Sequence, residues 1–290
     1  MGKSEHTLGH ILQDLELENK EAYNRSKYHL STKVGRYGLN TFDFSAKKVN
    51  ESLNQSLEIL QCDHIDMVFV HDIEFAEHLE QVWQETLPFL FELKSNKHKP
   101  IVRHIGVSGM PLSVLDHVMS RFGYQHIDTV LTYNSHILFN NQLLNYLPRW
   151  KKHNIGIIHG GTTGLGLLTP QGPPEWHPAN HLPIFREACE EAMKYVTKRK
   201  GVGNDHNWEL IRLAFLYCFD TDFIHSTLVG ATNEQEFLRY VDWSAMPVHK
   251  EDKDLILWLQ HNVFAPVMNR MWVNPGTEKN ICNSHLHFYK

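Results

Sequence analysis

Residues 65–75, IDMVFVHDIEF, decide the fold class of this chain. The run over residues 65–70 is nearly continuous in apolar side chains, which is typical of a parallel strand buried on both faces. It stops abruptly at His71 and Asp72. The preceding residues 45–60 predict an amphipathic helix with Ser45 as its N-cap, because apolar residues recur there at helical spacing. A helix that leads into a buried strand is the repeating unit of a parallel α/β sheet.

The same alternation continues along the chain. Strands are predicted in residues 28–34, 65–70, 102–107, 129–133, 155–158 and 227–229. Helices are predicted in residues 45–60, 82–93, 112–119, 142–150, 185–197, 208–219 and 234–241. A closed (β/α)8 barrel has eight strands, whereas an open doubly wound sheet carries a GxGxxG motif after its first strand, and that motif is absent here. A (β/α)8 TIM barrel that lacks its beginning therefore fits the pattern better.

Composition and charge limit the classes of protein to which this chain can belong. The chain has 290 residues, of which 42% are hydrophobic, and a net charge of −5, so it offers no basic field for nucleic acid. No apolar run approaches the ~20 residues of a membrane span, and the polar start has no signal-peptide core. We expect a cytoplasmic protein. Residues 1–243 form the predicted barrel domain, and residues 244–290 form a C-terminal extension with a helix over residues 255–263.

Neither cysteine nor histidine spacing predicts a metal site. The four cysteines have no CxxC pair, which indicates reduced thiols. The chain contains 21 histidines, and His285 and His287 stand in an HxH arrangement. Two imidazoles are too few for a tight zinc site, and no third ligand of matching spacing follows. We therefore expect no bound metal.

Two polar residues stand where strands end, which is where barrel enzymes place their working groups. Lys33 ends the first predicted strand, and His71 ends the next one. Adjacent strands lie about 4.8 Å apart, so the two side chains can meet in one site. An enclosed lysine has a lowered pKa and stabilises a nearby anion, and a neutral imidazole can polarise a carbonyl. The ordinary alternative is that Lys33 pairs with a carboxylate and His71 caps a loop.

Longer segments resemble the aldo-keto reductases, and most closely their L-galactose-dehydrogenase-like branch. The segments are STKVGRY, FDFSAKKVNESLNQSLEILQCDHIDMVFVHDIEF, NKHKPIVRHIGVSG, IGIIHGGTTGLGLLT and GPPEWHPA, and the similarity covers roughly residues 2–243. HDIEF followed by GPPEWHPA is specific to that branch. The resemblance implies a barrel that binds NAD(P) at its mouth and transfers hydride between nicotinamide and a carbonyl or hydroxyl carbon of a small sugar-like or aldehyde substrate.

The family works with a tetrad of Tyr, Lys, His and Asp. The resemblance implies that Lys33 is the lysine that lowers the tyrosine pKa and that His71 orients the substrate carbonyl. The Asp and Tyr belong to a DTxxxYG segment just before an SExxLG motif, which here is Ser4, Glu5, Leu8 and Gly9. We therefore expect a chain truncated by two strands and one helix. The alternative function is that of a catalytically impaired isoform or pseudoenzyme that acts by binding.

The resemblance also implies cofactor contacts. Ser108 and Thr132 match positions that hold the nicotinamide amide, although Gly109 replaces the usual asparagine. Gly161 and Thr162 belong to the pyrophosphate loop, where backbone amides suit phosphate. The remaining contacts lie in the adenosine-ribose loop, which contains Gly230, Thr232 and Glu236. Carboxylates in that loop favour a free ribose hydroxyl, so NAD is expected before NADP.

A polyol-binding mouth is a further hypothesis, because carboxylates and aromatic faces suit sugar hydroxyls. Its candidate residues are Asp72, Glu74, Glu175, Trp176 and His177. Tryptophans at helical spacing, by contrast, predict packing rather than binding. These are Trp83, Trp150, Trp208 and Trp258. The sequence leaves the substrate and the oligomeric state open.

Overall fold

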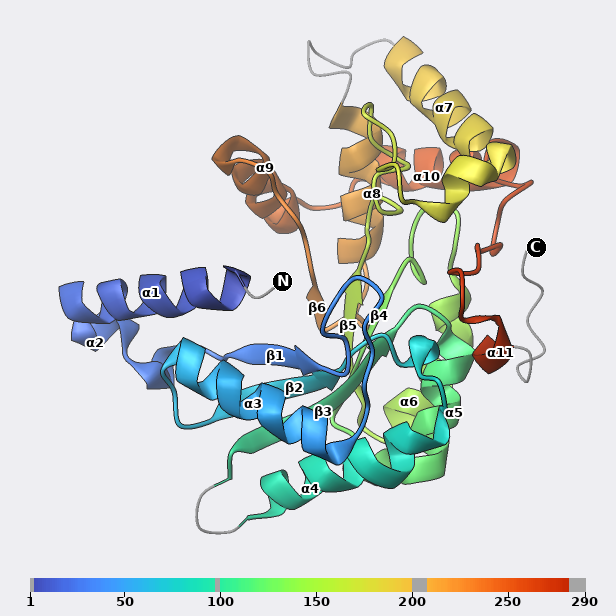
Figure 1. Ribbon diagram of the computed structural model, residues 1–290. Coiled ribbons are helices and arrows are strands. Elements are labelled where there is room, and N and C mark those ends of the chain that lie inside the picture. The colour runs from blue at the N-terminus through green and yellow to red at the C-terminus, as the bar shows by residue number, and fades with distance from the viewer. Residues whose placement is uncertain (1–2, 97–99, 200–207, 282–290) are drawn as a thin grey trace. The chain divides into compact units, whose positions relative to one another are not determined.

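The computed structural model describes residues 3–96, 100–199 and 208–281, in which helices and strands alternate (Figure 1). The strands are β1 (Ser31–Val34), β2 (Ile65–Val70), β3 (Val102–Gly109), β4 (Thr129–Tyr133), β5 (Gly156–Gly160) and β6 (Ser226–Thr227). The helices are α1 (Lys3–Glu18), α2 (Lys20–Tyr23), α3 (Ala46–Leu60), α4 (Leu87–Ser95), α5 (Leu112–Phe122), α6 (Leu147–Lys152), α7 (Pro183–Lys198), α8 (Glu209–Phe219), α9 (Glu234–Ala245), α10 (Lys250–Asn262) and α11 (Glu278–Ile281). Short 3-10 segments join several of them.

The strands are parallel and follow the chain order. The sheet order is β1-β2-β3-β4-β5-β6. β1 pairs with β2, β2 with β3, and β5 with β6, each in parallel register. This confirms the predicted α/β class with six parallel strands joined by helical crossovers.

The chain divides into two compact units. The first unit contains Met1–Leu131 and His153–Ile155, and the second contains Thr132–Lys152 and Gly156–Lys290. Helices α3, α4 and α5 pack on the strands of the first unit. In the second unit α10 packs on α8, and Arg212 of α8 is paired with Asp252 of α10 at 2.6 Å. The helix of the predicted C-terminal extension thus packs within the second unit, while the boundary at residue 243 stays a prediction.

Helix α3 forms as its sequence predicts. The Ser45 side chain accepts from the Lys48 amide at its first turn, which satisfies one of the free donors there. Val49 and Leu53 are almost completely buried, and so is most of Leu60. The helix ends at Gln61, which adopts the left-handed conformation. The apolar stripe faces the sheet and holds β1 and β2 in place.

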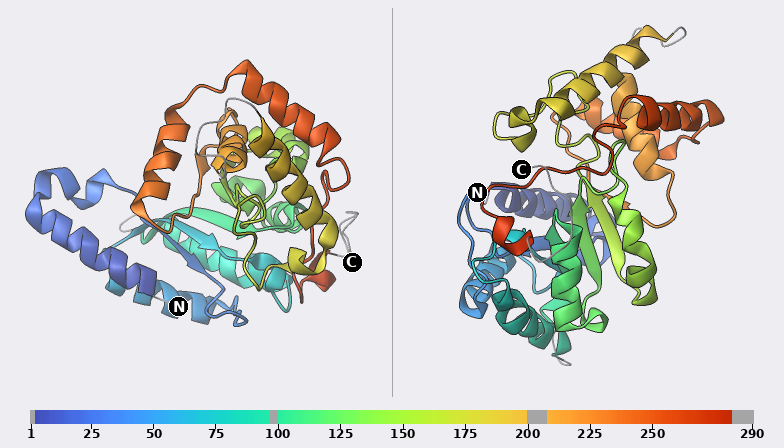
Figure 2. Two further views of the ribbon diagram at one scale, coloured as in Figure 1. Left: turned by 90° about the horizontal axis from the view of Figure 1, so that it is seen from above. Right: turned by 90° about the vertical axis from the view of Figure 1, so that its right-hand side faces the viewer.

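Helix α1 is an element that the sequence pattern did not predict, and it lies against α3 (Figure 2). Its Glu5 carboxylate accepts from the hydroxyls of Thr32 in β1 and Ser56 in α3. Gly9 lets the two helix backbones approach, since a Cβ there would lie 2.3 Å from the Ile59 carbonyl oxygen. Polar bonds and this close approach attach α1 to the first unit.

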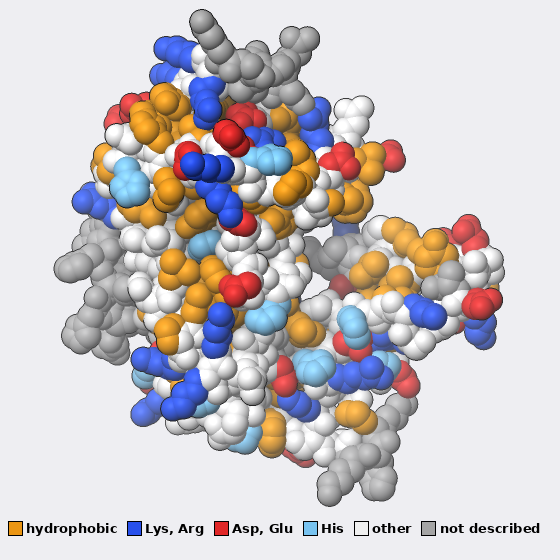
Figure 3. All heavy atoms as spheres, turned by 180° about the vertical axis from the view of Figure 1, so that it is seen from behind, with side chains coloured by type: hydrophobic (Ala, Val, Ile, Leu, Met, Phe, Trp, Pro, Cys, Tyr) orange, Lys and Arg blue, Asp and Glu red, His pale blue; other side chains and the backbone are white. Residues whose placement is uncertain are grey.

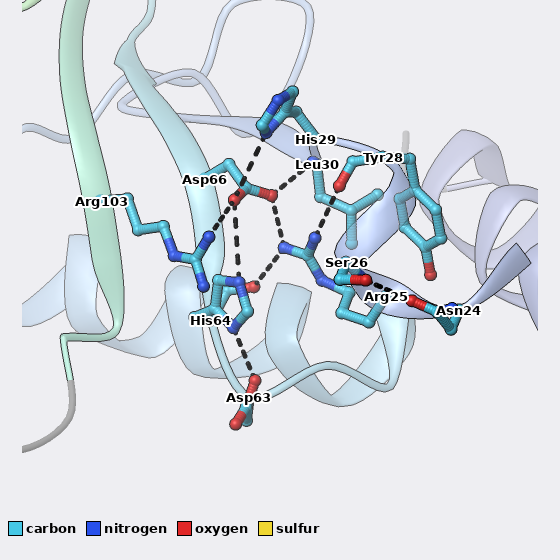
Figure 4. Close-up of polar contacts among 10 residues, drawn as sticks. All are labelled: Asn24, Arg25, Ser26, Tyr28, His29, Leu30, Asp63, His64, Asp66 and Arg103. Carbon is cyan, nitrogen blue, oxygen red and sulfur yellow. Dashed lines mark hydrogen bonds and ion pairs between the residues drawn. The ribbon is translucent and has the colours of Figure 1, made fainter.

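A buried carboxylate near the amino end of β2 ties several segments of the first unit together (Figure 4). Asp66 is 3% exposed and accepts from the Leu30 amide at 2.8 Å and from Arg25 at 2.5 Å. Arg103 of β3 lies 3.2 Å from its other oxygen. Burial alone would raise the pKa of Asp66, but the Leu30 amide and the Arg25 guanidinium outweigh burial and hold the pKa below its usual value.

The described residues contain no helix that is long and apolar enough to cross a bilayer. Within the same residues no group of three metal-ligating side chains comes together. Three cysteines, Cys62, Cys189 and Cys218, are free thiols, as expected. The fourth, Cys282, lies outside the described residues, as do His285 and His287 of the HxH arrangement.

Candidate active site

Lys33 and His71 lie on one face at the carboxyl ends of β1 and β2. Lys33 is in register with Phe69, and side chains two residues apart on a strand share a face, so His71 follows on the face of Lys33. The His71 amide donates to the Val34 carbonyl at 2.8 Å, which extends the pairing by one bond. The structure therefore places the two predicted residues next to each other, within range of electrostatic interaction.

The surroundings of the two side chains differ. Lys33 is exposed among the described residues, so the enclosed setting that we expected for it is not found. The burial pattern alternates between exposed and buried residues along β1. The His71 side chain is 28% exposed and is therefore the more enclosed of the two.

The His71 imidazole is neutral at neutral pH. Burial lowers its pKa below the ordinary value, because a charged ring loses hydration there. The Asp72 carboxylate opposes this effect, whereas the positive charges of Lys33 and Arg36 add to it. A neutral imidazole can accept one hydrogen bond and donate another, which is the state that proton transfer requires.

The carboxylates after His71 face inward, and the structure contradicts the idea that they line a polyol mouth. Asp72 is 3% exposed and Glu74 is fully buried. One Glu74 oxygen accepts from the Met110 amide at 3.0 Å. The other lies where a side chain at Gly109 would be, since a Cβ built there would meet it at 2.2 Å. Gly109, which replaces the family's asparagine, makes room for Glu74.

Two other predicted contacts are buried. Ser108 lies in β3 and Thr132 in β4, and both are fully enclosed. Within the described part of the chain neither hydroxyl has a hydrogen-bond partner. A buried hydroxyl without a partner is costly, so such groups often serve a ligand or an ordered water. Their assignment to the nicotinamide amide stays a prediction.

In the second unit, one pocket of about 480 Å³ brings five predicted cofactor residues together. Gly161 and Thr162 come from the loop after β5, Gly230 and Thr232 from the loop between β6 and α9, and Glu236 from the first turn of α9. The volume falls within the range of about 300–1,000 Å³ that is usual for small-molecule sites. The assignment of these residues to a dinucleotide stays a prediction.

The Glu236 carboxylate of α9 holds the loop that precedes this helix. Glu236 accepts from the Thr232 amide at 2.7 Å and from the Thr232 hydroxyl at 2.9 Å. Asn233 caps the helix by accepting from the Glu236 amide at 2.9 Å. These bonds fix the Glu236 carboxylate at the wall of the pocket, where it presents negative charge.

The glycine-rich loop after β5 rests on a buried polar layer. Gly161 has a φ of +71°, and a Cβ there would meet the Asn134 side chain at 2.4 Å, so only glycine fits. The Thr162 hydroxyl lies beside the buried Cys218 thiol. Burial raises the pKa of that thiol to about 12, which keeps it protonated. The Cys218 thiol is therefore an uncharged neighbour of the Thr162 side chain in this loop.

Aromatic residues of the same pocket escaped the sequence analysis. Trp208, Phe215 and Tyr240 line it, and Phe215 is stacked on Tyr240 with ring centroids 4.4 Å apart. The Arg239 guanidinium lies over the Trp208 ring at 5.0 Å. The prediction that Trp208 only packs is incomplete, because this ring also faces the pocket. Aromatic residues at helical spacing predict a core, so the sequence carried no signal for this second role.

The Pro-rich loop is only partly open to solvent. Trp176 is 69% exposed, and Glu175 is exposed as well. His177 is fully buried, caps a short 3-10 turn through the Ala179 amide and packs edge-on against Trp272. Burial lowers the His177 pKa to about 4, so it stays neutral. His177 thus has a structural role in the second unit, and a role in sugar binding stays a prediction.

Similarity to known proteins agrees with this arrangement. The chain is 34% identical to L-galactose dehydrogenase of Arabidopsis thaliana, over 93% of this chain and 78% of that protein. It is 27% identical to D-arabinose 1-dehydrogenase of Saccharomyces cerevisiae, over 93% of this chain and 80% of that protein.

Solved structures share the fold. An aldo-keto reductase from Bacillus halodurans in its holo form superposes with a TM-score of 0.63 at 21% identity, over 88% of this chain and 77% of that one. The glycerol dehydrogenase of Gluconobacter oxydans gives a TM-score of 0.60 at 18% identity, over 94% and 80% of the two chains. The Aldo/keto reductase family matches residues 1–257. The chain therefore belongs to the aldo/keto reductase family.

Proposed function

We propose that this protein is an NAD-dependent oxidoreductase that acts on a sugar-like or aldehyde substrate. The observation that carries the proposal is the pocket of the second unit, in which the loop after β5 meets the loop before α9. Similarity to L-galactose dehydrogenase and to D-arabinose 1-dehydrogenase supports a sugar as the substrate class. Lys33 and His71 are the proposed catalytic residues. The TIM-barrel type of fold and the cytoplasmic location belong to the same proposal.

The residues present fit a dinucleotide. Gly161 and Gly230 leave their backbone open to the pocket, and Thr162 and Thr232 contribute polar groups. Backbone amides and hydroxyls in such loops suit the oxygens of a pyrophosphate. The aromatic rings of Trp208 and Tyr240 supply flat apolar surface of the kind that an adenine ring covers. When bound, the nicotinamide would supply the hydride chemistry.

The cofactor preference rests on Glu236. Its carboxylate lies at the pocket wall and can accept from a ribose hydroxyl, whereas it would repel a 2′-phosphate. This supports NAD over NADP. Arg239 of the same helix lies over Trp208. If NAD and NADP bind with equal affinity, the Arg239 guanidinium is the positive charge to remove by substitution.

Paired substitutions on α9 test the assignment. Glu236→Gln removes the carboxylate at the pocket, and Glu234→Gln makes the same charge change in the first turn of α9, at a residue that is not among those lining the pocket. We expect Glu236→Gln to weaken NADH binding about tenfold, through loss of a charge-assisted hydrogen bond of about 1.5 kcal/mol, and to narrow the preference over NADPH. Equal effects of both variants on NADH affinity would contradict the assignment.

Turnover is tested separately from binding. Formation of NADH from NAD is followed by its near-ultraviolet absorbance with L-galactose and with D-arabinose as substrates. We expect His71→Gln to reduce the rate by about 10²- to 10⁴-fold, the usual contribution of a group that transfers a proton. An unchanged rate in this variant would remove His71 from the site.

A second candidate function is that of a catalytically impaired relative that acts by binding another molecule. The resemblance matches Lys33 and His71 to the family tetrad, and it matches no residue of this chain to the Asp and Tyr. Apolar side chains are also exposed on two helices: Leu8, Ile11 and Leu17 on α1, which is seen at the right of Figure 3, and Phe237, Leu238 and Val241 on α9. Exposed apolar stripes favour association. NADH binding without turnover would support this candidate.

A further inference from the structure

The second unit contains another pocket, which the proposed function does not use. It lies between residues 167–173, in the loop after β5, and α7, the yellow helix of Figure 1. We call it the α7 pocket. Its volume is about 440 Å³, which falls within the range of about 300–1,000 Å³ that is usual for small-molecule sites. Thr169 and Gln171 also line the pocket that we assign to the dinucleotide, so the two pockets share part of a wall.

The loop wall of the α7 pocket is held by its own bonds. The Thr169 hydroxyl donates to the Gly166 carbonyl at 2.8 Å, and the Gly172 amide donates to the Thr169 carbonyl at 3.0 Å. Gly166 has a φ of +102°, and a Cβ there would lie 3.0 Å from the Gly172 carbonyl oxygen. The Asn180 side chain donates to the Pro174 carbonyl at 2.7 Å. A wall that is already ordered lowers the entropic cost of binding a ligand.

The least exposed residues of the α7 pocket form an apolar floor. Leu167 of the loop is 5% exposed and Cys189 of α7 is 4% exposed, and Met193 lies one helical turn after Cys189. Burial raises the pKa of the Cys189 thiol, so the thiol is uncharged. This floor favours a ligand with an apolar body, because covering it removes apolar surface from water.

The rim of the α7 pocket has a surplus of positive charge. Arg186 and Lys194 line it, and Glu190 is the one carboxylate among its lining residues. Glu190 lies 3.7 Å from Arg186, and these two half-exposed side chains compensate each other. Within the described part of the chain Lys194 has neither an ion pair nor a hydrogen bond. The Lys194 ammonium is therefore available to a negatively charged ligand.

We propose that the α7 pocket binds a small organic anion with an apolar body, such as a medium-chain carboxylate. The negative group lies at Lys194, and the body covers the floor of Leu167, Cys189 and Met193. A neutral sugar fits less well, because it has neither the charge nor the apolar body. The inference is independent of the proposed function, since none of the residues that we assign to the dinucleotide or to catalysis lines the α7 pocket.

Equilibrium dialysis of the full chain against labelled octanoate tests the inference, with and without saturating NADH. We expect saturable binding of one octanoate per chain under both conditions. Each buried methylene contributes about fourfold in affinity, so hexanoate should bind about fifteenfold more weakly than octanoate.

A pair of charge reversals on α7 tests the position of the ligand. Lys194→Glu should weaken octanoate binding about tenfold, because it replaces an exposed attraction by a repulsion. Lys198→Glu makes the same change one helical turn later, at a residue that does not line the pocket, and should leave octanoate binding unchanged. Both lysines are exposed, so both variants should fold.

Three results would overturn the inference: no saturable binding of octanoate, equal weakening in the two lysine variants, or displacement of octanoate by NADH, which would place it in the dinucleotide pocket. Glu236→Gln should weaken NADH binding and leave octanoate binding unchanged. A chain that binds octanoate as expected but does not bind NADH would contradict the proposed function and leave the α7 pocket as an anion site.

Discussion

The two ends of β2 carry the same residue types in two different arrangements. Near its amino end, Asp66 is surrounded by two arginines, a backbone amide and two histidines (Figure 4). After its carboxyl end, Asp72 contacts one arginine and one histidine. Both carboxylate oxygens of Asp66 contact groups from other segments, and these contacts join the segments of the first unit. Around Asp72 the contact with the histidine is looser, since Nε2 of His71 lies 3.5 Å from the carboxylate.

The difference teaches that a buried Asp–Arg pair is no sign of function by itself. In barrel enzymes the amino ends of strands contribute stability and the carboxyl ends contribute chemistry. Asp66 fits the first role because Arg25 also donates to the Tyr28 and His64 carbonyls, which fastens the chain that enters β1. Asp72 fits the second role because it lies 3.5 Å from His71, the proposed catalytic residue. Matched Asp→Asn substitutions test whether the two ends of β2 have these different roles.

The largest expected effect is that of Asp66→Asn on stability. The asparagine side chain has one acceptor oxygen where Asp66 has two, and its NH2 group faces an arginine. The partly buried positive charge of that arginine then has no partner. We expect the free energy of unfolding to fall by about 3 kcal/mol, the lower end of the range for breaking a buried ion pair. Urea unfolding measures this. A loss below about 1 kcal/mol would contradict the structural role of Asp66.

The two sites should also respond to acid in different pH windows. The folded-state pKa of Asp66 is lowered, so its contribution to stability is complete above the unfolded value of about 3.9 and is lost as the pH falls through the folded value. The advantage of the unchanged protein over Asp66→Asn should therefore shrink at low pH. An advantage that persisted through acid unfolding would contradict this assignment.

At the other end, the folded-state pKa of His71 is also lowered. The unfolded chain then binds the proton first, so stability begins to fall below about pH 6.5, at a rate of at most about 1.4 kcal/mol per pH unit. In the His71→Gln variant this loss of stability below about pH 6.5 should be absent. Unfolding curves measured across the window for both proteins check the slope, and equal slopes would place His71 in a solvated setting.

Asp72→Asn should affect stability less than Asp66→Asn does. Arg36 retains its two backbone carbonyls and its two aromatic rings, and the asparagine carbonyl replaces one carboxylate oxygen. We expect a loss of about 1 kcal/mol, typical of a single hydrogen bond. The same urea experiment measures it. A loss as large as that of Asp66→Asn would mean that both ends of β2 serve stability alone.

Asp63→Asn should have the smallest effect. Asp63 is 63% exposed and lies 2.6 Å from His64, so solvent screens the pair. We expect a change below about 0.5 kcal/mol in urea unfolding, as for most exposed ion pairs. A larger change would indicate that His64 needs Asp63 in order to face Asp66.

The sequence predicted those elements whose signal is local. The apolar run of β2 and the N-cap and stripe of α3 lie where they were expected, because periodicity and capping act within one segment. Helix α1 escaped prediction because Leu8, Ile11 and Leu17 lie exposed and its attachment depends on polar contacts with distant segments. Those contacts come from tertiary packing.

The candidate site shows the same division. Lys33 and His71 were proposed because they lie where strands end, and the two loops that line the pocket were proposed from the resemblance to the family. The exposure of Lys33 and the inward orientation of Asp72 and Glu74 could not be predicted, since both depend on what packs beside them. The same holds for Trp208, which faces a pocket only after α8 and α9 come together.

Calorimetric titration of the full chain with NADH tests the proposed function most directly, because it needs no substrate and no turnover. We expect saturable binding of one NADH per chain, with weaker binding of NADPH and weaker NADH binding in Glu236→Gln than in Glu234→Gln. Absence of saturable heat with either dinucleotide would contradict the assignment of the pocket between the β5 loop and α9.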